Sequence, residues 1–156
     1  MTKTLAVLVT CLVVLLVACQ PKGIRIGAFL SLTGATSAYG VSAANAINMA
    51  KDEANAAGGI NARRIELEIE DDQSKTDDVP RIVEHLIKEH EVHALLAEPV
   101  SVRAMAAAPV AQQHQIVMIS SASVKPELTM QGNYIFVPAS SAQLKARSSR
   151  SSREGR

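Results

Sequence analysis

The chain has few aromatic residues, and this scarcity argues against a protein that binds nucleic acid by stacking its bases. Of its 156 residues 3% are aromatic and none is tryptophan, whereas proteins that bind single-stranded nucleic acid stack the bases on aromatic side chains. The formal net charge of +1 is also too small for a protein that binds the phosphate backbone electrostatically. We therefore expect no nucleic acid partner.

Cysteine is equally scarce, since only Cys11 and Cys19 are present. Both lie in an N-terminal segment that has a short positive start at 1–3 and an apolar run over 5–17. This run is shorter than the ~20 residues of a transmembrane helix and is typical of a secretory signal. We expect residues 1–18 to be a lipoprotein signal peptide.

The end of this segment, Leu16-Val17-Ala18-Cys19, resembles the bacterial lipobox. In that motif a peptidase cuts before the cysteine, which then carries lipid. Residues 19–23 would be a lipid-anchored linker without a disulfide partner for Cys19. The alternative is a plain signal peptide in which Cys19 is only a small apolar residue. We expect a periplasmic lipoprotein anchored to the lipid bilayer through Cys19.

In the body of the chain, residues 24–142, two kinds of hydrophobic pattern follow one another in alternation. Short apolar runs predict strands, and patterns of spacing i, i+3, i+4 or alanine-rich composition predict helices. The strands are expected at 24–30, 65–69, 92–96, 116–119 and 134–137, and the helices at 41–57, 79–87 and 102–113. Such alternation predicts a doubly wound α/β fold, a parallel sheet with helices on both faces.

Two local patterns refine this expectation. Glu66, Glu68 and Glu70 alternate with apolar residues, which indicates a strand with one wet face near an edge of the sheet. Asp77 or Asp78 is placed to cap the second helix, whose first turn contains Pro80.

The C-terminal segment 143–156 differs from the body because it consists mainly of Ser, Arg and Lys and has no apolar residue after Ala146. Such a segment buries too little apolar surface to order itself, so we expect a disordered basic tail. The alternative is a basic arm for nucleic acid or anionic lipid, and export disfavours the former.

Three hydroxyl-rich loops are the candidates for a ligand site. Ligands of an open parallel sheet bind outside the carboxyl ends of the strands, near the point where strand order reverses. The loops there are 33–40, 98–101 and 120–123. Hydroxyls and helix-start amides suit a carboxylate. Spacing alone nevertheless favours an interpretation of these Ser and Thr residues as helix caps.

The sequence lacks the motifs typical of nucleotide binding and of zinc binding. The glycines after the first strand form no dinucleotide fingerprint, and no P-loop lysine follows, so we expect no nucleotide cofactor. Residues 90–93 fall one short of the H-E-x-x-H zinc motif, and we interpret His85, His90 and His93 as solvated surface histidines without a metal.

The acidic pair Asp71 and Asp72 follows the second strand with no nucleophile and base at suggestive spacing. We expect cap or turn roles for both carboxylates and predict that the protein is not an enzyme.

Several segments in a fixed order carry a resemblance. They are Ile24-Arg25-Ile26-Gly27-Ala28-Phe29-Leu30-Ser31-Leu32-Thr33-Gly34, residues 52–61, Asp71-Asp72-Gln73-Ser74, Ala108-Pro109-Val110-Ala111 and Pro126-Glu127-Leu128-Thr129. Together they resemble the leucine/isoleucine/valine-binding family of periplasmic binding proteins. The resemblance implies a receptor of an ABC importer, of type I fold, that closes two α/β lobes over an amino acid or a related small molecule.

The resemblance also implies site residues. Ser101 matches the serine that receives the ligand carboxylate, Ala122 a position that contributes backbone, and Tyr39 an aromatic of the pocket wall. Val124 stands where the family often has a threonine, and the neighbouring Ser123 is expected to substitute for it. The implied partners are a small-molecule ligand, which is an amino acid or similar, if the second lobe is present, and a membrane permease.

The resemblance ends at Gln143, whereas members of the family are more than twice this long. We therefore expect a truncated product with an incomplete first lobe that lacks the second. Two other hypotheses remain open. One is a lipid-anchored structural or regulatory lipoprotein that contacts a partner protein, and the other is an exported hydrolase, for which a nucleophile constellation is lacking.

Overall fold

The computed structural model describes residues 22–120, 122–123 and 125–138. The predicted signal peptide, Cys19 and the basic tail 143–156 lie outside the described residues. Among the helices that are described, none combines the length and apolar character needed to span a bilayer.

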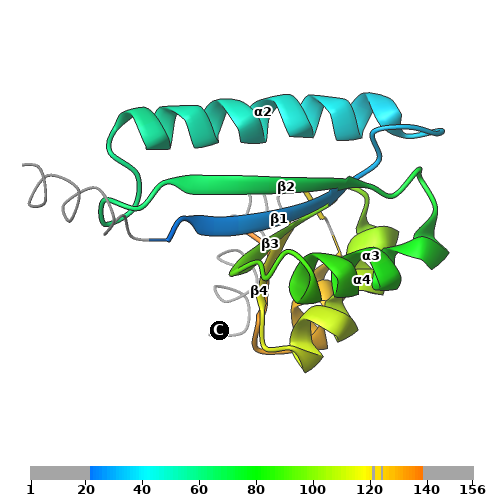
Figure 1. The fold of residues 1–156 in the computed structure, drawn as a ribbon. Coiled ribbons are helices and arrows are strands. Elements are labelled where there is room, and N and C mark those ends of the chain that lie inside the picture. The colour runs from blue at the N-terminus through cyan, green and yellow to red at the C-terminus, as the bar shows by residue number, and fades with distance from the viewer. Residues whose placement is uncertain (1–21, 121, 124, 139–156) are drawn as a thin grey trace, which may run out of the picture.

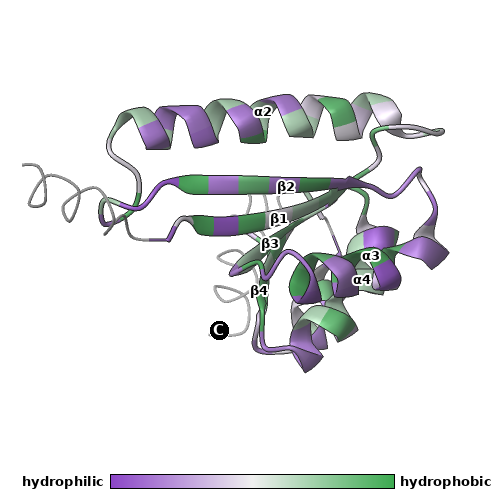
Figure 2. Cartoon of the chain, in the orientation of Figure 1, coloured by the Kyte–Doolittle hydropathy of each residue, from purple (hydrophilic) through white to green (hydrophobic). Residues whose placement is uncertain are grey.

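Five parallel strands form one sheet (Figure 1) in the order β2-β1-β3-β4-β5. Their bounds are β1 Ile24–Leu30, β2 Ile65–Asp71, β3 Ala94–Ala97, β4 Val117–Ser120 and β5 Ile135–Phe136. Each predicted strand is thus present, with ends that shift by a residue or two. The predicted edge position of the second strand is confirmed, and β2 alternates hydrophobic and hydrophilic residues along its length (Figure 2).

The helices cover both faces of this sheet, as the doubly wound fold requires. Helix α2 (Ser37–Ala56) lies along one face, and α3 (Val79–Lys88) and α4 (Ser101–Gln113) lie on the other (Figure 1). The described residues also include two short 3-10 helices, η1 (Thr76–Asp78) and η2 (Pro126–Gln131).

Helix α2 begins four residues earlier than the sequence pattern indicated. Gly40 lies in its first turn and is the buried residue of this helix. A Cβ atom at this position would overlap the carbonyl oxygen of Ser31, so only glycine permits this approach of the helix to the end of β1. Because glycine has a low helix propensity, the amino-acid composition around Gly40 did not predict this first helical turn.

The hydrophobic core lies between the sheet and the layer of α3 and α4. Phe29, Leu95 and Met118 of the strands are buried there with Val83 and Leu86 of α3. Four buried alanines of α4 bring that helix close to the strands: Ala104, Ala107, Ala108 and Ala111. The core is therefore one-sided, because α2 buries little against the opposite face.

Candidate functional site

The candidate ligand site lies at the carboxyl edge of the sheet, beside β1 and β3. The order β2-β1-β3 places the reversal of strand order between these two strands. The chain leaves β1 toward α2 on one face and leaves β3 toward α4 on the other. Loops that diverge to opposite faces leave a crevice between them, which is where open α/β sheets bind ligands.

Ser101 is the first residue of α4, and it is half-buried. The preceding Val100 is extended and contributes no side-chain cap. Its carbonyl accepts the amides of Arg103 and Ala104. The amides at the very start of an α-helix have no partner within the helix and favour negative charge. Ser101 therefore places a hydroxyl beside backbone donors that suit an anion.

A second hydroxyl joins Ser101 from the loop after β4. The Ser123 hydroxyl is buried and donates to Ser101 Oγ over 3.1 Å, and the Lys125 amide lies 3.4 Å from Ser123 Oγ. Tyr39, in the first turn of α2, is 65% exposed, and Ala122 is also exposed. The structure thus brings Ser101 and Ser123 together and leaves Tyr39 and Ala122 on the surface of the same edge.

The interpretation of the loop hydroxyls as helix caps is wrong for α2 and α4. Thr36 precedes α2 but makes no capping hydrogen bond, and α4 is preceded by Val100. The Thr36 hydroxyl lies 3.1 Å from Ser31 Oγ and 3.0 Å from Ser74 Oγ instead. The Thr36 hydroxyl therefore bonds to these serine hydroxyls at the carboxyl edge of the sheet and not to the amides at the start of α2.

The predicted cap of α3 is also wrong. Asp78 immediately precedes this helix but makes no capping bond, because Thr76–Asp78 already form a 3-10 turn. Its backbone has helical angles rather than the extended angles of a typical cap residue.

Beneath the serines lies a buried polar network that sequence reasoning missed. Ser31, Asp72, Glu98 and Arg103 are all buried. The Ser31 hydroxyl lies 2.6 Å from Asp72 Oδ1 and 2.8 Å from Glu98 Oε1. The Arg103 guanidinium donates to both oxygens of Glu98 and lies 3.7 Å from Asp72 Oδ2. Two carboxyl groups thus share one cation.

The surroundings of Asp72 in this network shift its pKa. Burial, with a smaller contribution from the Glu98 charge, raises the pKa of Asp72, and the hydrogen bonds from Ser31 and Ser74 oppose this only in part. Hydrogen bonding to Glu98, partly offset by burial, raises the pKa of Arg103. Burial and the Glu98 charge thus shift Asp72 toward its protonated form, whereas the hydrogen bonds to Glu98 stabilise the charged form of Arg103.

The network fixes the position of the candidate site. Arg103 is two residues after Ser101, and its Nη2 donates to the Thr36 hydroxyl over 2.6 Å. It therefore ties the start of α4 to the start of α2 and to the ends of β2 and β3. Glu98 and Arg103 lie five residues apart in an otherwise apolar region, and this isolation was the signal available in the sequence.

The turn role expected for Asp71 is confirmed. Its Oδ1 accepts the amides of Leu32 and Gln73, each over 2.8 Å, and its Oδ2 accepts the Thr33 hydroxyl over 2.6 Å. Burial works against ionisation, but these hydrogen bonds prevail and lower the pKa of Asp71. The carboxylate thus holds the loop after β1 against the end of β2.

The three histidines singled out in the sequence contact groups outside this polar network, namely Glu68, Glu70 and Arg25. The predicted surface location is confirmed for His85 and His93, and His90 is half-buried. His93 accepts the Arg25 amide over 3.1 Å. His85 and His90 pack edge to face with ring centroids 5.1 Å apart. The near-miss motif at 90–93 therefore does not gather its histidines, whereas His85 and His90 meet beside β2.

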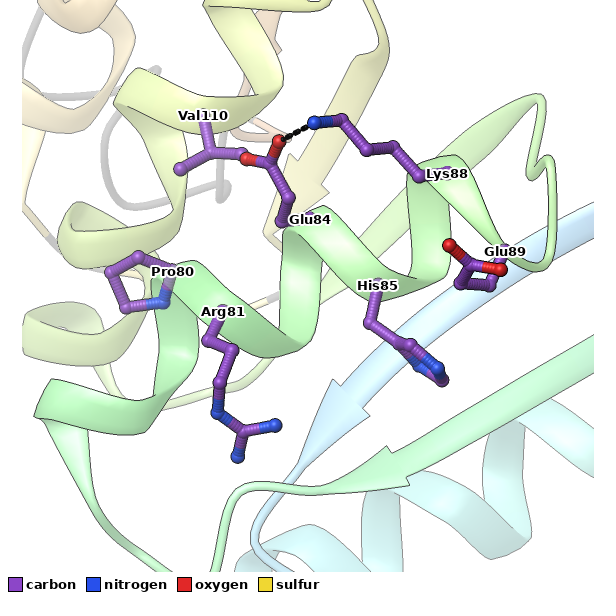
Figure 3. A pocket seen from close by; sticks show the side chains of 7 residues that line it. All are labelled: Pro80, Arg81, Glu84, His85, Lys88, Glu89 and Val110. Atoms are coloured by element: carbon purple, nitrogen blue, oxygen red, sulfur yellow. Dashed lines mark ion pairs between the residues drawn. The ribbon is translucent and has the colours of Figure 1, made fainter.

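A shallow open hollow lies on the outer surface of α3 (Figure 3). It is lined by Pro80, Arg81, Glu84, His85, Lys88, Glu89 and Val110. Glu84 pairs with Lys88 over 2.5 Å and with His114 over 3.4 Å. The hollow lies on the outer surface of α3, away from the carboxyl ends of the strands where open α/β sheets bind ligands, so we do not assign the ligand site there.

Comparison with known proteins identifies the family. A family model described as periplasmic binding protein matches residues 23–149. The chain therefore belongs to the periplasmic binding protein family, as the resemblance implied. Members of this family bind solutes and are not enzymes, and the family points to a periplasmic or extracellular location. No curated protein matches the chain.

Solved structures agree with this assignment. The chain is 30% identical, with a TM-score of 0.71, to the branched-chain amino acid transporter substrate binding protein LivJ from Streptococcus pneumoniae in complex with isoleucine. It is 31% identical, with a TM-score of 0.65, to a putative branched-chain amino acid ABC transporter from Silicibacter pomeroyi. A solute binding protein from Rhodopseudomonas palustris in complex with 3,4-dihydroxybenzoic acid shares the fold at 24% identity and a TM-score of 0.68.

Each of these matches covers 74% of this chain, but only 33%, 31% and 31% of the respective solved chain. The chain thus spans about a third of the length of the structures it matches. The architecture described above is one part of a larger binding protein fold.

Proposed function

We propose that this chain forms part of the substrate-binding component of an ABC importer, and that its ligand is a branched-chain or related amino acid. The observation that carries the proposal is the pairing of Ser101 and Ser123 over 3.1 Å at the start of α4. Two hydroxyls and helix-start amides match the oxygens of a carboxylate.

In this proposal each predicted residue has a separate task. Ser101 donates to the ligand carboxylate, and Ser123 holds Ser101 in position and takes the place of the threonine expected at 124. Ala122 offers backbone to the ligand. Tyr39 is exposed because it forms the rim of a wall that a second lobe would cover.

The site as described is open on one side, and this limits its affinity. A hydrogen bond that faces water contributes only about 0.5 to 1.5 kcal/mol, whereas immobilising a ligand costs several kcal/mol. The longer relatives have two further thirds of chain to supply the opposite wall. We therefore expect no measurable amino acid binding by the 156-residue chain alone.

A chimera tests this function. Residues 22–138, joined to the C-terminal part of the Streptococcus pneumoniae protein, should bind leucine, isoleucine or valine in calorimetry. Ser101→Ala should weaken binding by about 1 to 3 kcal/mol, because a buried ligand oxygen loses its donor. Ser101→Thr is the matched control, since it keeps the hydroxyl and should lose less.

The same titrations should include 3,4-dihydroxybenzoate, which shares the carboxylate but not the ammonium group. Preference for it would keep the carboxylate site and overturn the amino acid assignment. Unaffected binding by the Ser101→Ala chimera, or tight binding by the unextended chain, would contradict the site itself.

We also propose that residues 1–18 are removed, that Cys19 carries lipid, and that the anchored protein delivers its ligand to a membrane permease. The support is the lipobox-like sequence before Cys19. Intact-mass measurement of protein expressed in bacteria should show a lipid-modified N-terminal cysteine. Cys19→Ala should move the protein from the membrane fraction to the soluble fraction, and unchanged fractionation would contradict the anchor.

A further inference from the structure

A cluster of metal-ligating side chains lies beside β2, away from the carboxyl-edge site. Glu70, His85 and His90 each offer one ligand atom, and these atoms all lie within 4.8 Å of one another. Glu70 Oε1 lies 2.7 Å from His85 Nδ1 and 4.0 Å from His90 Nε2. Two imidazoles and a carboxylate are a ligand set that zinc commonly takes.

The backbone holds both histidines in place. His85 lies in α3, and Figure 3 shows its side chain pointing from this helix toward the strands. The amide of His90 donates to the carbonyl of His85 over 3.4 Å, and the carbonyl of His90 accepts Arg25 Nη1 over 2.7 Å. Glu91 then turns the chain with a positive φ of 48°. The two rings are thus presented together by the end of one helix.

Glu68 adds a fourth group to the cluster. Its Oε2 lies 3.7 Å from His90 Nδ1, on the opposite side of the ring from the nitrogen that faces Glu70. A carboxylate on one imidazole nitrogen orients the ring and leaves the other nitrogen for a metal. The alternation of β2, in which Glu68 and Glu70 share a face, places both carboxylates at this spot.

The distances suit a tetrahedral ion after small side-chain adjustments. Zinc bonds of 2.0 to 2.2 Å to nitrogen and oxygen imply about 3.4 Å between ligand atoms. The 2.7 and 4.0 Å separations from Glu70 lie on either side of this value. The side chains of the cluster are half-buried or exposed, so rotamer changes and a water ligand are both accessible.

The charge of the cluster also favours a cation. Over the part of the chain that the structure describes, Glu68 and Glu70 form ion pairs with histidines and with no Lys or Arg. The nearby cations are engaged elsewhere, since Arg25 pairs with Glu91 and Lys88 with Glu84. A bound cation would supply the charge partner that Lys and Arg do not provide to these two glutamates.

We propose that Glu70, His85 and His90 form a binding site for a zinc-type divalent ion, with Glu68 orienting His90. The ion would join the edge strand β2 to the C-terminal end of α3. This site is independent of the amino acid site, and its ligand is the metal itself.

Equilibrium dialysis of the full chain against Zn²⁺ tests the proposal, with Cys11→Ser and Cys19→Ser in every sample so that thiols do not compete. One ion per chain should bind. His85→Gln, His90→Gln and Glu70→Gln should each weaken binding about tenfold or more, because removal of outer-sphere partners alone has effects of that size. His93→Gln is the matched control, an exposed histidine outside the cluster, and should leave affinity unchanged.

A second measurement keeps the histidines and glutamates of the cluster unchanged, so that it does not depend on whether the variants fold. Addition of Zn²⁺ should shift the imidazole ¹⁵N signals of His85 and His90 and leave those of His93 and His114 in place. Absence of stoichiometric binding would overturn the proposal. So would equal losses in His93→Gln, or shifts spread over all four histidines, because either result describes unspecific binding by surface imidazoles.

Discussion

The two faces of the sheet differ sharply in how much they bury. On the face of α3 and α4, helices with buried apolar or alanine rows close over Phe29, Leu95 and Met118. On the face of α2, the helix contributes Gly40 as its buried residue, while Ile119 of β4 and Phe136 of β5 are 36% and 49% exposed. Among the described residues, one face is packed into a core, whereas on the other face α2 covers β1 and β2.

The difference shows what the chain achieves by itself. Burial of apolar surface is the main favourable term in folding, so most of the stability of this chain must come from the α3 and α4 face. The exposed apolar residues beside α2 are of the kind that mark a contact with further protein. The longer relatives have such further chain, which agrees with the proposal that the ligand site also needs a second part.

The largest expected effect comes from the group that links the two faces. Arg103 connects Glu98 and Asp72 to Thr36 at the start of α2. In Arg103→Met two buried carboxyl groups lose their cation, which should cost about 3 to 5 kcal/mol of unfolding free energy. Urea denaturation followed by circular dichroism measures this.

Hydrogen exchange gives the control for this variant. Amides of α2 should lose protection more than those of α3, because α2 has little other burial to hold it. Equal loss in both helices would mean that Arg103 supports the molecule as a whole and not the link between faces.

A paired truncation compares the faces directly. Leu86→Ala removes a fully buried side chain from the α3 face and should lower the unfolding free energy by about 2 to 5 kcal/mol. Met49→Ala removes an exposed side chain from α2 and should change it by less than about 0.5 kcal/mol. Similar losses in the two variants would contradict the one-sided core.

Much of this architecture could be predicted because strands and helices leave periodic apolar patterns. The run Ile24 to Leu30 and the alternation around Glu66, Glu68 and Glu70 gave both the strands and the edge position of β2. The start of α2 could not be predicted, because Gly40 is required by a backbone approach that exists only in three dimensions.

The candidate site was likewise predictable in part. The position of Ser101 at the start of α4 follows from the α/β pattern, and its role came from resemblance. Glu98 and Arg103 were missed because pairing between buried charges depends on which strand ends lie side by side. The meeting of Glu70 with His85 and His90 was missed for the same reason, since it joins a strand to a helix end across the sheet edge.

A smaller effect than those of Arg103 and Leu86 is expected at Asp72, which follows the end of β2 between the two faces. Its pKa is raised in the folded protein, mainly by burial. A raised pKa means that the folded state holds the proton more tightly than the unfolded state. The resulting stability is present below the unfolded value of about 3.9 and is lost as the pH rises through the folded value.

Asp72→Asn keeps the oxygen that accepts from Ser31 and Ser74 and cannot ionise. Measured by urea denaturation, the variant should lose less than about 1 kcal/mol at the acidic end of the pH profile, where the protonated form of Asp72 is favoured. At pH 7 it should equal or exceed the parent, because the parent must then ionise a buried carboxyl or hold its proton against the solvent.

Asp71→Asn is the matched comparison, since the pKa of Asp71 is lowered, because hydrogen bonds from Thr33, Gln73 and Leu32 outweigh its burial. Its contribution has the opposite sign, being present above about 3.9 and lost as the pH falls through the folded value. Asp71→Asn should therefore destabilise most at pH 7, where Asp72→Asn is harmless. Parallel pH profiles for the two variants would contradict the opposite signs expected for Asp71 and Asp72, and would show that burial does not favour the protonated form of Asp72.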